Sequence, residues 1–452
     1  MTTAPGELGT APARGIARAG ATDALRLIRD VLLPTMGKGV LRRRPRVVGL
    51  LERTGIEERG IRRLQALRQA YGPHPVLVSL LGRKQLILTD PEDMLRVLRE
   101  TPATFLSTSD EKSAALAHFE PGASLISDGS ERRVRRDFNG RLLDEGCPRH
   151  RLADRFQRVV REEIAALLAE LPENGTQDAT LDWEHFFTAW NRIIRRTLLG
   201  DGAREDTELT ADLEKLRAAG NWAFLHPGRK RLREDFHRRL QAHIDRGEPG
   251  SLAGLVAQTA EQDEARPVDQ FTHYMFAFDP GGMATFRALA LLSTHEDVLM
   301  QVRDQLRGDD PLPLLRATIL ESLRLWPTTP VILRQARHDT DWNGGTIPEG
   351  AQVVIYAPFF HRDDTSVDAA HRFAPEHFPE GRVQRGSRFV PFSEGDGICP
   401  ARDLVPMVGA MALAELLATH SPRLTNPDRL PPGRPLPLTL DNYTLEFTLS
   451  PA

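Results

Sequence analysis

The segment Phe392-Ser393-Glu394-Gly395-Asp396-Gly397-Ile398-Cys399-Pro400-Ala401 decides the fold prediction, because it presents one cysteine in an unusual setting. An isolated cysteine is most often an ordinary core residue. Here two glycines precede it, and glycine lets the backbone adopt positive φ and approach a flat ligand closely. Pro400 suits the first position of a helix, whose positive end would lower the pKa of the thiol. The loop therefore predicts a thiolate that is presented to iron.

Length and composition describe a folded protein of ordinary type. The chain has 452 residues, of which 40% are hydrophobic and 27% are charged, enough for one large or two ordinary domains. A formal net charge of -3 provides no general cationic field, so nucleic acid is not an expected partner. Two cysteines, Cys147 and Cys399, cannot form a disulfide framework and fit a reducing compartment. We expect any special cysteine to be a ligand or a nucleophile.

The N-terminal residues carry no recognisable targeting signal. Residues 1–22 are mainly small and polar, so they predict a flexible tail, followed by one domain over residues 23–452. The tail lacks the apolar core of a signal peptide. No window of about 18 uncharged apolar residues follows it. These features predict a cytoplasmic protein without a membrane partner.

Hydrophobic patterning predicts a mainly α protein with a smaller β region. Two apolar runs around Gly82 predict a hairpin over residues 76–88, and Asp90 before Pro91 predicts the start of a helix. Helical spacing dominates residues 128–320. Short β-like runs between proline and glycine turns follow Arg324. Many helices with a sheet at one end is the expected α+β architecture.

The cysteine loop resembles that of the cytochrome P450 superfamily, soluble bacterial type, with Phe392, Gly395 and Cys399 at matching positions. The resemblance implies a single haem-binding domain with the P450 fold, haem b as cofactor, and Cys399 as the axial ligand of the haem iron. Gly397 stands where the family has a basic partner of a haem propionate. Ala401 replaces the usual glycine. Pro406, inside the expected following helix, predicts a bend or interruption.

A second resemblance lies upstream of the loop. Glu321 and Arg324, three positions apart on one helical face, are similar to the family's Glu-x-x-Arg pair, which locks the core beneath the haem. The third member of this structural triad would be His377, which replaces the usual arginine. Its ring can still donate a hydrogen bond, with a shorter reach and a pH-dependent charge.

Three arginines match the family's haem-propionate partners. Arg334 lies in a run similar to the family's propionate-binding strand, and Arg132 and Arg136 lie one helical turn apart in a run similar to its propionate-binding helix. Arg132 replaces the usual histidine and retains a donor. Arg133 and Arg135, in the same basic run, are expected on a solvated face or a redox-partner patch.

The segment that aligns with the family's oxygen-activation helix departs most from the pattern. Asp279 keeps the acid, but Pro280 replaces the threonine whose hydroxyl helps to deliver protons. A proline removes one amide donor and leaves the Phe276 carbonyl without its helical partner, so we expect a distorted helix. Thr285 lies more than one turn onward and does not replace the lost hydroxyl. Asp279 with ordered water, or a polar group of the substrate, would have to serve instead.

The leading function is oxidation of a small organic molecule by a haem-thiolate monooxygenase, in secondary metabolism, with electrons from ferredoxin and ferredoxin reductase. Asp279 and Pro280 are the candidate catalytic positions. By family position, Phe276, Phe278 and Val331 would line the substrate pocket.

Two alternatives remain open. Pro280 favours an atypical haem-thiolate catalyst, such as a peroxygenase, a dehydratase or a group-transfer enzyme. A haem sensor or ligand carrier without turnover is the third hypothesis. Peroxide-driven turnover would favour the first alternative, and ligand-induced spectral change without turnover would favour the second.

Overall fold

The computed structural model describes residues 16–80, 82–172, 178–222, 228–259, 262–307, 312–343 and 345–452. The sheets hold few of these residues. One six-stranded sheet has the order β1-β2-β3-β9-β6-β4, a three-stranded sheet has the order β10-β11-β5, and β7 pairs with β8. The strands are β1 Ala17–Arg18, β2 Val76–Leu80, β3 Arg83–Ile87, β4 Phe105–Leu106, β5 Ala179–Asp182, β6 Val331–Ala336, β7 Thr340–Trp342, β8 Gly345–Ile347, β9 Gln352–Tyr356, β10 His420–Leu424 and β11 Glu446–Pro451.

Helices make up most of the described chain. The N-terminal ones are α1 Ala21–Leu27, a π-helical turn Ile28–Leu32, α2 Leu33–Lys38, α3 Pro45–Thr54, α4 Ile56–Tyr71, α5 Pro91–Arg99, α6 Asp110–Leu116 and α7 Gly129–Leu142. The central ones are α8 Ala153–Glu170, α9 Trp183–Leu199, α10 Thr207–Gly220, α11 Lys230–Arg246, α12 Leu252–Val256, α13 Gln262–Ala265 and α14 Pro267–Thr294. The last are α15 Glu296–Gln305, α16 Leu312–Leu325, α17 Ala357–Arg362 and α18 Leu404–Leu417.

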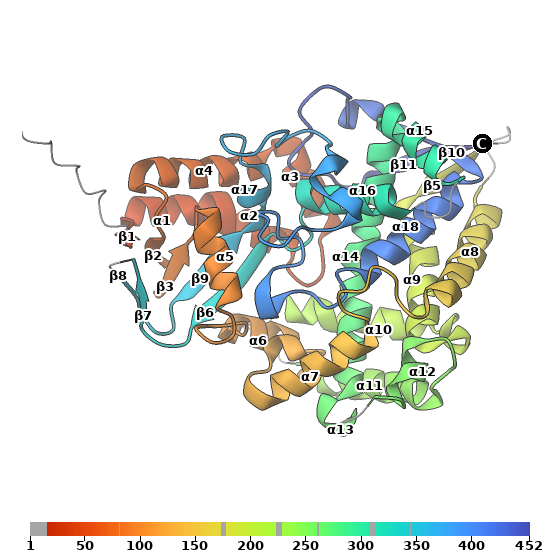
Figure 1. Ribbon diagram of the computed structural model, residues 1–452, viewed down its shortest axis with the longest axis horizontal. Helices are drawn as coiled ribbons and strands as arrows, with labels where there is room; N and C mark the ends of the chain where they lie inside the picture. Colours follow the sequence, from red (N-terminus) through yellow and green to blue (C-terminus); the bar gives the residue numbers. More distant parts are fainter. Residues whose placement is uncertain are drawn as a thin grey trace, which may run out of the picture.

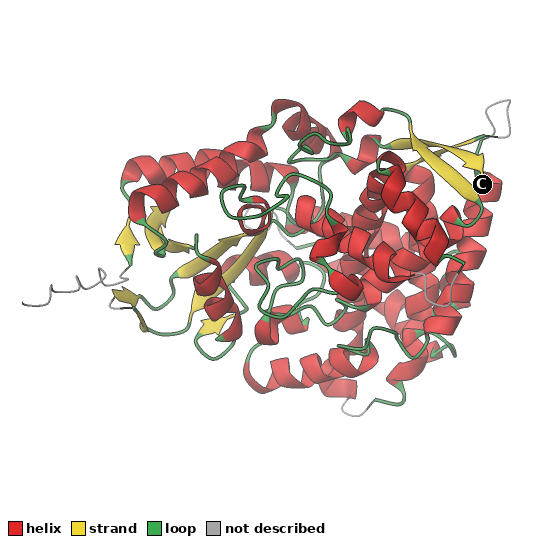
Figure 2. Cartoon of the chain, turned by 45° about the horizontal axis from the view of Figure 1, so that its top comes forward, coloured by secondary structure: helices red, strands yellow, loops and turns green. Residues whose placement is uncertain are grey.

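The elements separate into two parts with separate cores. Figure 1 shows the large sheet on one side with α1, α4 and α5 around it, and the remaining helices on the other side. One hydrophobic cluster fills the helical part, and a second lies around the sheet. Figure 2 shows the strands in two separate groups at opposite sides of the molecule, with helices over most of the rest. The predicted α+β class with dominant helices is confirmed.

Local sequence signals explain several boundaries. β2 and β3 pair as the predicted antiparallel hairpin, with Gly82 at φ +77 in the turn. The Asp90 carboxylate accepts from the backbone N–H groups of Glu92 and Asp93, and α5 begins at Pro91. Both predictions are confirmed because each rests on contacts between near neighbours in the chain.

The predicted boundary of the N-terminal tail is wrong. Ala17 and Arg18 form β1, which pairs in parallel with β2, and α1 begins at Ala21. Backbone hydrogen bonds to a distant strand hold these residues, which composition alone does not show. Residues 1–15 lie outside the described residues. Within the described ranges, no helix combines the length and apolar character that a membrane crossing needs.

Candidate active site

The cysteine loop is a compact turn between the large sheet and α18. The Cys399 N–H donates to the Phe392 carbonyl at 2.9 Å, and the Ile398 N–H donates to the Gly395 carbonyl at 3.0 Å. Gly395 has φ +64, and a Cβ there would collide with the Leu98 carbonyl oxygen of α5. The glycine is therefore required by close packing of the loop on α5. Phe392 and Cys399 are half-buried, and Ala401 is buried.

Two expectations about the following helix are wrong. α18 begins at Leu404, five residues after the cysteine, so Pro400 is not its first residue. Pro406 then falls in the first turn, where a missing N–H leaves no helical carbonyl unpaired, and α18 continues to Leu417 without interruption. Burial raises the pKa of the Cys399 thiol, and the N–H of Ala401 opposes this shift only in part. Burial therefore outweighs the local donors, and the raised pKa is opposite to the predicted lowering.

Helix α7 holds the loop with two of the predicted arginines. Arg132 Nη2 donates to the Asp396 carbonyl at 2.7 Å, and Arg136 Nη1 donates to the Ile398 carbonyl at 2.9 Å. Arg133 is exposed as expected. Arg135 is buried and contacts Ser127 and Glu131, so its prediction as a solvated residue is wrong. Its position on the same helical face as Arg132, three residues apart, explains the burial.

Arg334 approaches the loop from β6. Its guanidinium donates to the Thr101 hydroxyl at 3.1 Å and to the Ser393 hydroxyl at 3.0 Å. A Cβ on Gly397 would lie 2.5 Å from Arg334 Nη2. The glycine therefore makes room for Arg334, and the guanidinium occupies the place where a basic side chain at position 397 would begin.

A third cation, Lys112 of α6, joins Arg132 and Arg334. Burial, followed by the charges of the two arginines, lowers the pKa of Lys112 to about 7. Burial likewise lowers the pKa of Arg334 to about 10, with Arg132 adding to the effect. Within the described part of the chain, none of the three lies within ion-pair distance of a carboxylate, and Arg132 Nε is buried without a partner. Buried cations without counterions are costly, so this cluster suits an anionic ligand.

The three side chains of the structural triad lie together, but His377 is held less closely than Glu321 and Arg324. Arg324 binds both carboxylate oxygens of Glu321, at 2.6 and 2.7 Å, and both side chains are fully buried. Burial alone would raise the pKa of Glu321, but the ion pair with Arg324 lowers it. His377 Nδ1 lies 3.5 Å from Glu321 Oε2, which is a contact rather than a good hydrogen bond. Arg324 also donates to four backbone carbonyls, those of His361, Ala369, Ala370 and Arg372.

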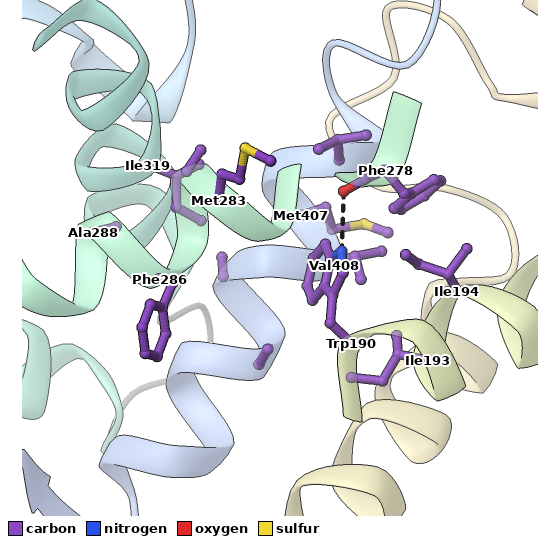
Figure 3. Packing of buried hydrophobic residues seen from close by; sticks show 14 of the residues in the cluster. Trp190, Ile193, Ile194, Phe278, Met283, Phe286, Ala288, Ile319, Met407 and Val408 are labelled. Atoms are coloured by element: carbon purple, nitrogen blue, oxygen red, sulfur yellow. Dashed lines mark hydrogen bonds between the residues drawn. The ribbon is translucent and has the colours of Figure 1, made fainter. Parts of the chain in front are cut away.

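Pro280 lies inside α14, which runs unbroken from Pro267 to Thr294. The expected distortion does not interrupt the helix. The indole N–H of Trp190, on α9, donates to the Phe278 carbonyl at 3.0 Å, as Figure 3 shows. A Cβ on Gly282 would lie 2.8 Å from the Trp190 ring, so the glycine lets the indole approach the helix. Packing from α9 thus supports the helix beside its proline.

The candidate distal residues separate onto different faces of α14. Asp279 forms an ion pair with Arg217 of α10, and the Arg217 guanidinium lies 4.7 Å from the centre of the Phe276 ring. Phe278, which is predicted to line the pocket, is fully buried and packs toward Trp190. Residues two apart on a helix point about 200° apart, so Phe276 and Phe278 cannot face one pocket. Val331 is half-buried at the start of β6.

Sequence reasoning missed Lys112, Ser393, Trp190 and Arg217. Lys112, Trp190 and Arg217 are brought to the site by other elements, Ser393 belongs to the loop itself, and none of the four carries a local pattern that marks its role. The only available signal was the absence of a basic residue at Gly397, which indicated that another cation would be needed.

Known proteins are similar to this chain in sequence or in fold. A family model described as cytochrome P450 matches residues 288–440. Ferruginol synthase from Salvia miltiorrhiza is 30% identical over 407 residues, covering 78% of this chain and 81% of that protein. Sugiol synthase from the same plant is 24% identical over 418 residues, covering 80% and 83%. The structure of the retinoic acid-bound cyanobacterial CYP120A1 matches with a TM-score of 0.67 and 17% identity, covering 86% and 94%.

Fold and relatives together define an oxidoreductase of the haem-binding type. The chain belongs to the cytochrome P450 family. That family implies a haem cofactor, and the residues present fit it: the buried Arg132 and Arg334 and the half-buried Lys112, none of them ion-paired among the described residues, stand beside a loop that carries a half-buried thiol. A flat ligand with two carboxylates would neutralise the cations.

Proposed function

We propose that this protein is a haem-thiolate monooxygenase that oxidises a small organic molecule in secondary metabolism. The observation that carries the proposal is the convergence of Arg132, Arg136 and Arg334, from two separate elements, on the loop of Cys399. The names of ferruginol synthase and sugiol synthase, each a maker of a small organic product, support the substrate class. The bacterial and cytoplasmic character predicted from the sequence belongs to the same proposal.

The proposed cofactor is haem b, with Cys399 as the axial ligand. When bound, haem would supply the iron chemistry that activates oxygen. Arg132 and Arg334, with Lys112, would hold the propionates, and Arg136 would keep the loop in place through the Ile398 carbonyl. Gly395 would keep the loop on α5.

On the distal side, Asp279 is the proposed proton carrier, and Phe276 and Val331 are the proposed pocket residues. The Asp279 carboxylate is bound to Arg217 through Oδ2, so the ion pair holds the orientation of the proposed proton carrier. Electrons would arrive from ferredoxin through a partner surface that includes exposed Arg133.

The test is the absorption spectrum of the reduced protein with and without carbon monoxide. Wild type is expected to show a strongly red-shifted Soret band, and Cys399→Ala is expected to lose it. Cys147→Ala is the matched control, because Cys147 is the other free cysteine and is exposed. Protein that binds no haem, or a band that survives in Cys399→Ala, would contradict the proposal.

A second candidate function is an atypical haem-thiolate catalyst that uses peroxide. The observation in its favour is that Pro280 supplies no hydroxyl while Asp279 is held in an ion pair. Turnover with hydrogen peroxide that gains nothing from NADPH, ferredoxin and reductase would favour it. Strict dependence on the reductase system would favour the monooxygenase.

A further inference from the structure

A small cavity lies beside α14, apart from the cysteine loop. Its walls come from α2, α14, the end of α16 and the segment 438–443, and its lining includes Met283, Trp326 and Tyr443. Cys399 and the arginines that contact its loop are not among the lining residues. The cavity is therefore a separate feature whose ligand the haem site does not explain.

The charges around this cavity do not balance. Lys38, Arg43 and Arg287 line it, and Glu57 is the one acid among the lining residues. Glu57 is already bound to Lys38 and to the Thr439 hydroxyl. In the described chain neither Arg43 nor Arg287 forms an ion pair with a carboxylate, and both bind only backbone carbonyls. Neither guanidinium is thus bound directly to a carboxylate, although the charge of Glu57 acts on both and that of Asp441 acts on Arg287.

Two of the lining residues carry buried polar atoms without partners. Arg287 is 8% exposed, and its buried Nε has no hydrogen-bond partner among the described residues. Asn442 is 0% exposed, and neither its Nδ2 nor its Oδ1 has a partner there. Buried polar groups are nearly always satisfied, so these atoms indicate a missing ligand. The Asn442 Oδ1 would accept from a water or a hydroxyl bound with it.

Size limits what the cavity can hold. Its volume is about 40 Å³. On this measure one water needs roughly 10–15 Å³, so there is room for a group of about three heavy atoms. A carboxylate has three heavy atoms and two acceptor oxygens. It matches the donors of Arg287 and Asn442 as well as the surplus positive charge.

Position links the cavity to the proposed oxidation site. Met283 lies about one helical turn after Asp279 on α14, and Pro330 of the lining directly precedes Val331. Tyr443, at the cavity wall, is close enough to Asp279 and Arg217 for both charges to act on its hydroxyl. Met283 therefore brings the cavity within about two helical turns of Phe276 along α14.

We propose that this cavity binds the carboxylate of the substrate through Arg287, Arg43 and Asn442, so that the enzyme acts on small organic acids. The assignment of the bound acid as a substrate rests on the proposed function. The cavity as a carboxylate site rests on its own residues alone.

The first experiment measures carboxylate binding to the haem-loaded protein by thermal melting. Sodium acetate is the probe, acetamide is the neutral probe of the same shape, and chloride keeps the ionic strength constant. Acetate is expected to raise the melting temperature with saturation, and acetamide is not. Arg287→Gln is expected to weaken acetate binding about tenfold or more, because a charged donor is lost. Arg307→Gln, which changes an exposed arginine on the surface, is the matched control.

If Arg287→Gln fails to fold, acetate binding is measured with Arg43→Gln and Asn442→Leu, which change two other lining residues of the cavity. Equal shifts with acetate and acetamide would overturn the proposal. So would acetate binding that all three variants retain, since the anion would then bind elsewhere.

The second experiment tests the substrate assignment through the spin-state shift of the Soret band. Decanoate is expected to produce a larger shift than decanol, and Arg287→Gln is expected to remove the difference. A haem-thiolate spectrum with no preference for decanoate would overturn the assignment and leave the proposed function intact. Loss of the thiolate spectrum itself would instead contradict the proposed function, and acetate binding would still test the cavity.

Discussion

Asp279 of α14 and Arg217 of α10, which are 62 residues apart in sequence, form a buried ion pair that joins the two helices. Arg217 also donates to the Leu41 carbonyl, at 2.7 and 3.1 Å, so it ties the N-terminal region to the same point. The acid that the sequence marked as catalytic is therefore also a structural partner. The role of Asp279 in proton transfer therefore depends on its ion pair with Arg217, which the sequence of α14 alone does not predict.

Removing one partner of this pair is predicted to cost more than removing both. Asp279→Asn leaves a buried guanidinium without a counterion and is expected to lower the free energy of unfolding by about 3–5 kcal/mol. The double variant Asp279→Leu, Arg217→Met is expected to cost less than the sum of the single changes. Urea denaturation of wild type, Asp279→Leu, Arg217→Met and the double variant measures the difference, with Asp279→Asn as a further single variant. Additive single and double effects would mean that the pair is not coupled.

Gly397→Ala is predicted to disturb the site from within the loop. Its new Cβ would lie 2.5 Å from Arg334 Nη2, so the guanidinium must move away from Ser393. We expect a loss of about 1–3 kcal/mol in stability and a lower haem content per protein. Gly228→Ala is the control, because no atom lies within 4 Å of a Cβ there. Equal haem content in the two variants would show that Arg334 tolerates a side chain at position 397.

The stability of the protein is predicted to depend strongly on Arg324 of the triad and very little on His377. Arg324→Ala leaves Glu321 buried without its cation and frees four backbone carbonyls, so we expect a loss of at least about 3–5 kcal/mol or failure to fold. His377→Ala removes a 3.5 Å contact and is expected to cost about 1 kcal/mol or less. Chemical denaturation and soluble yield compare the two. Equal losses of stability in the two variants would contradict the prediction, because His377 would then contribute as much as Arg324.

Stability is predicted to fall below about pH 6.5, partly through His361. This side chain is fully buried, its Nε2 accepts from the Val390 N–H at 2.9 Å, and burial lowers its pKa to about 3. A group with a lowered pKa in the folded state gains protons first in the unfolded state. Its stabilisation is therefore present above the unfolded value near 6.5 and is lost as pH falls toward 3.

The measurement is urea denaturation at pH 7.0, 6.0 and 5.0 for wild type and His361→Gln. In this window one such group contributes a slope of up to about 1.4 kcal/mol per pH unit. His361→Gln is expected to be less stable at pH 7.0 and to show a shallower fall. Parallel curves for the two proteins would assign the acid sensitivity to other groups.

Local sequence signals predicted much of the fold and part of the site. Asp90 before Pro91 fixes the start of α5, and Gly82 fixes the turn between β2 and β3, because the interacting groups lie within a few residues of each other. The same local logic failed at Pro400, where the residues up to Asp403 form turns before α18 begins. Helical position alone also does not reveal that the Phe278 carbonyl accepts from Trp190 of another helix.

The sequence by itself determined the loop around Cys399, the Glu321 and Arg324 pair, and the arginines at positions 132, 136 and 334, since each belongs to a short pattern with fixed spacing. Only the tertiary structure decided that Lys112 joins Arg132 and Arg334, that Asp279 is held by Arg217, and that Arg287 and Asn442 share a cavity. The physical reason is the range of the interactions. Turns, caps and pairs on one helical face are set by neighbours, whereas a buried charge acquires its partner only when distant elements pack together.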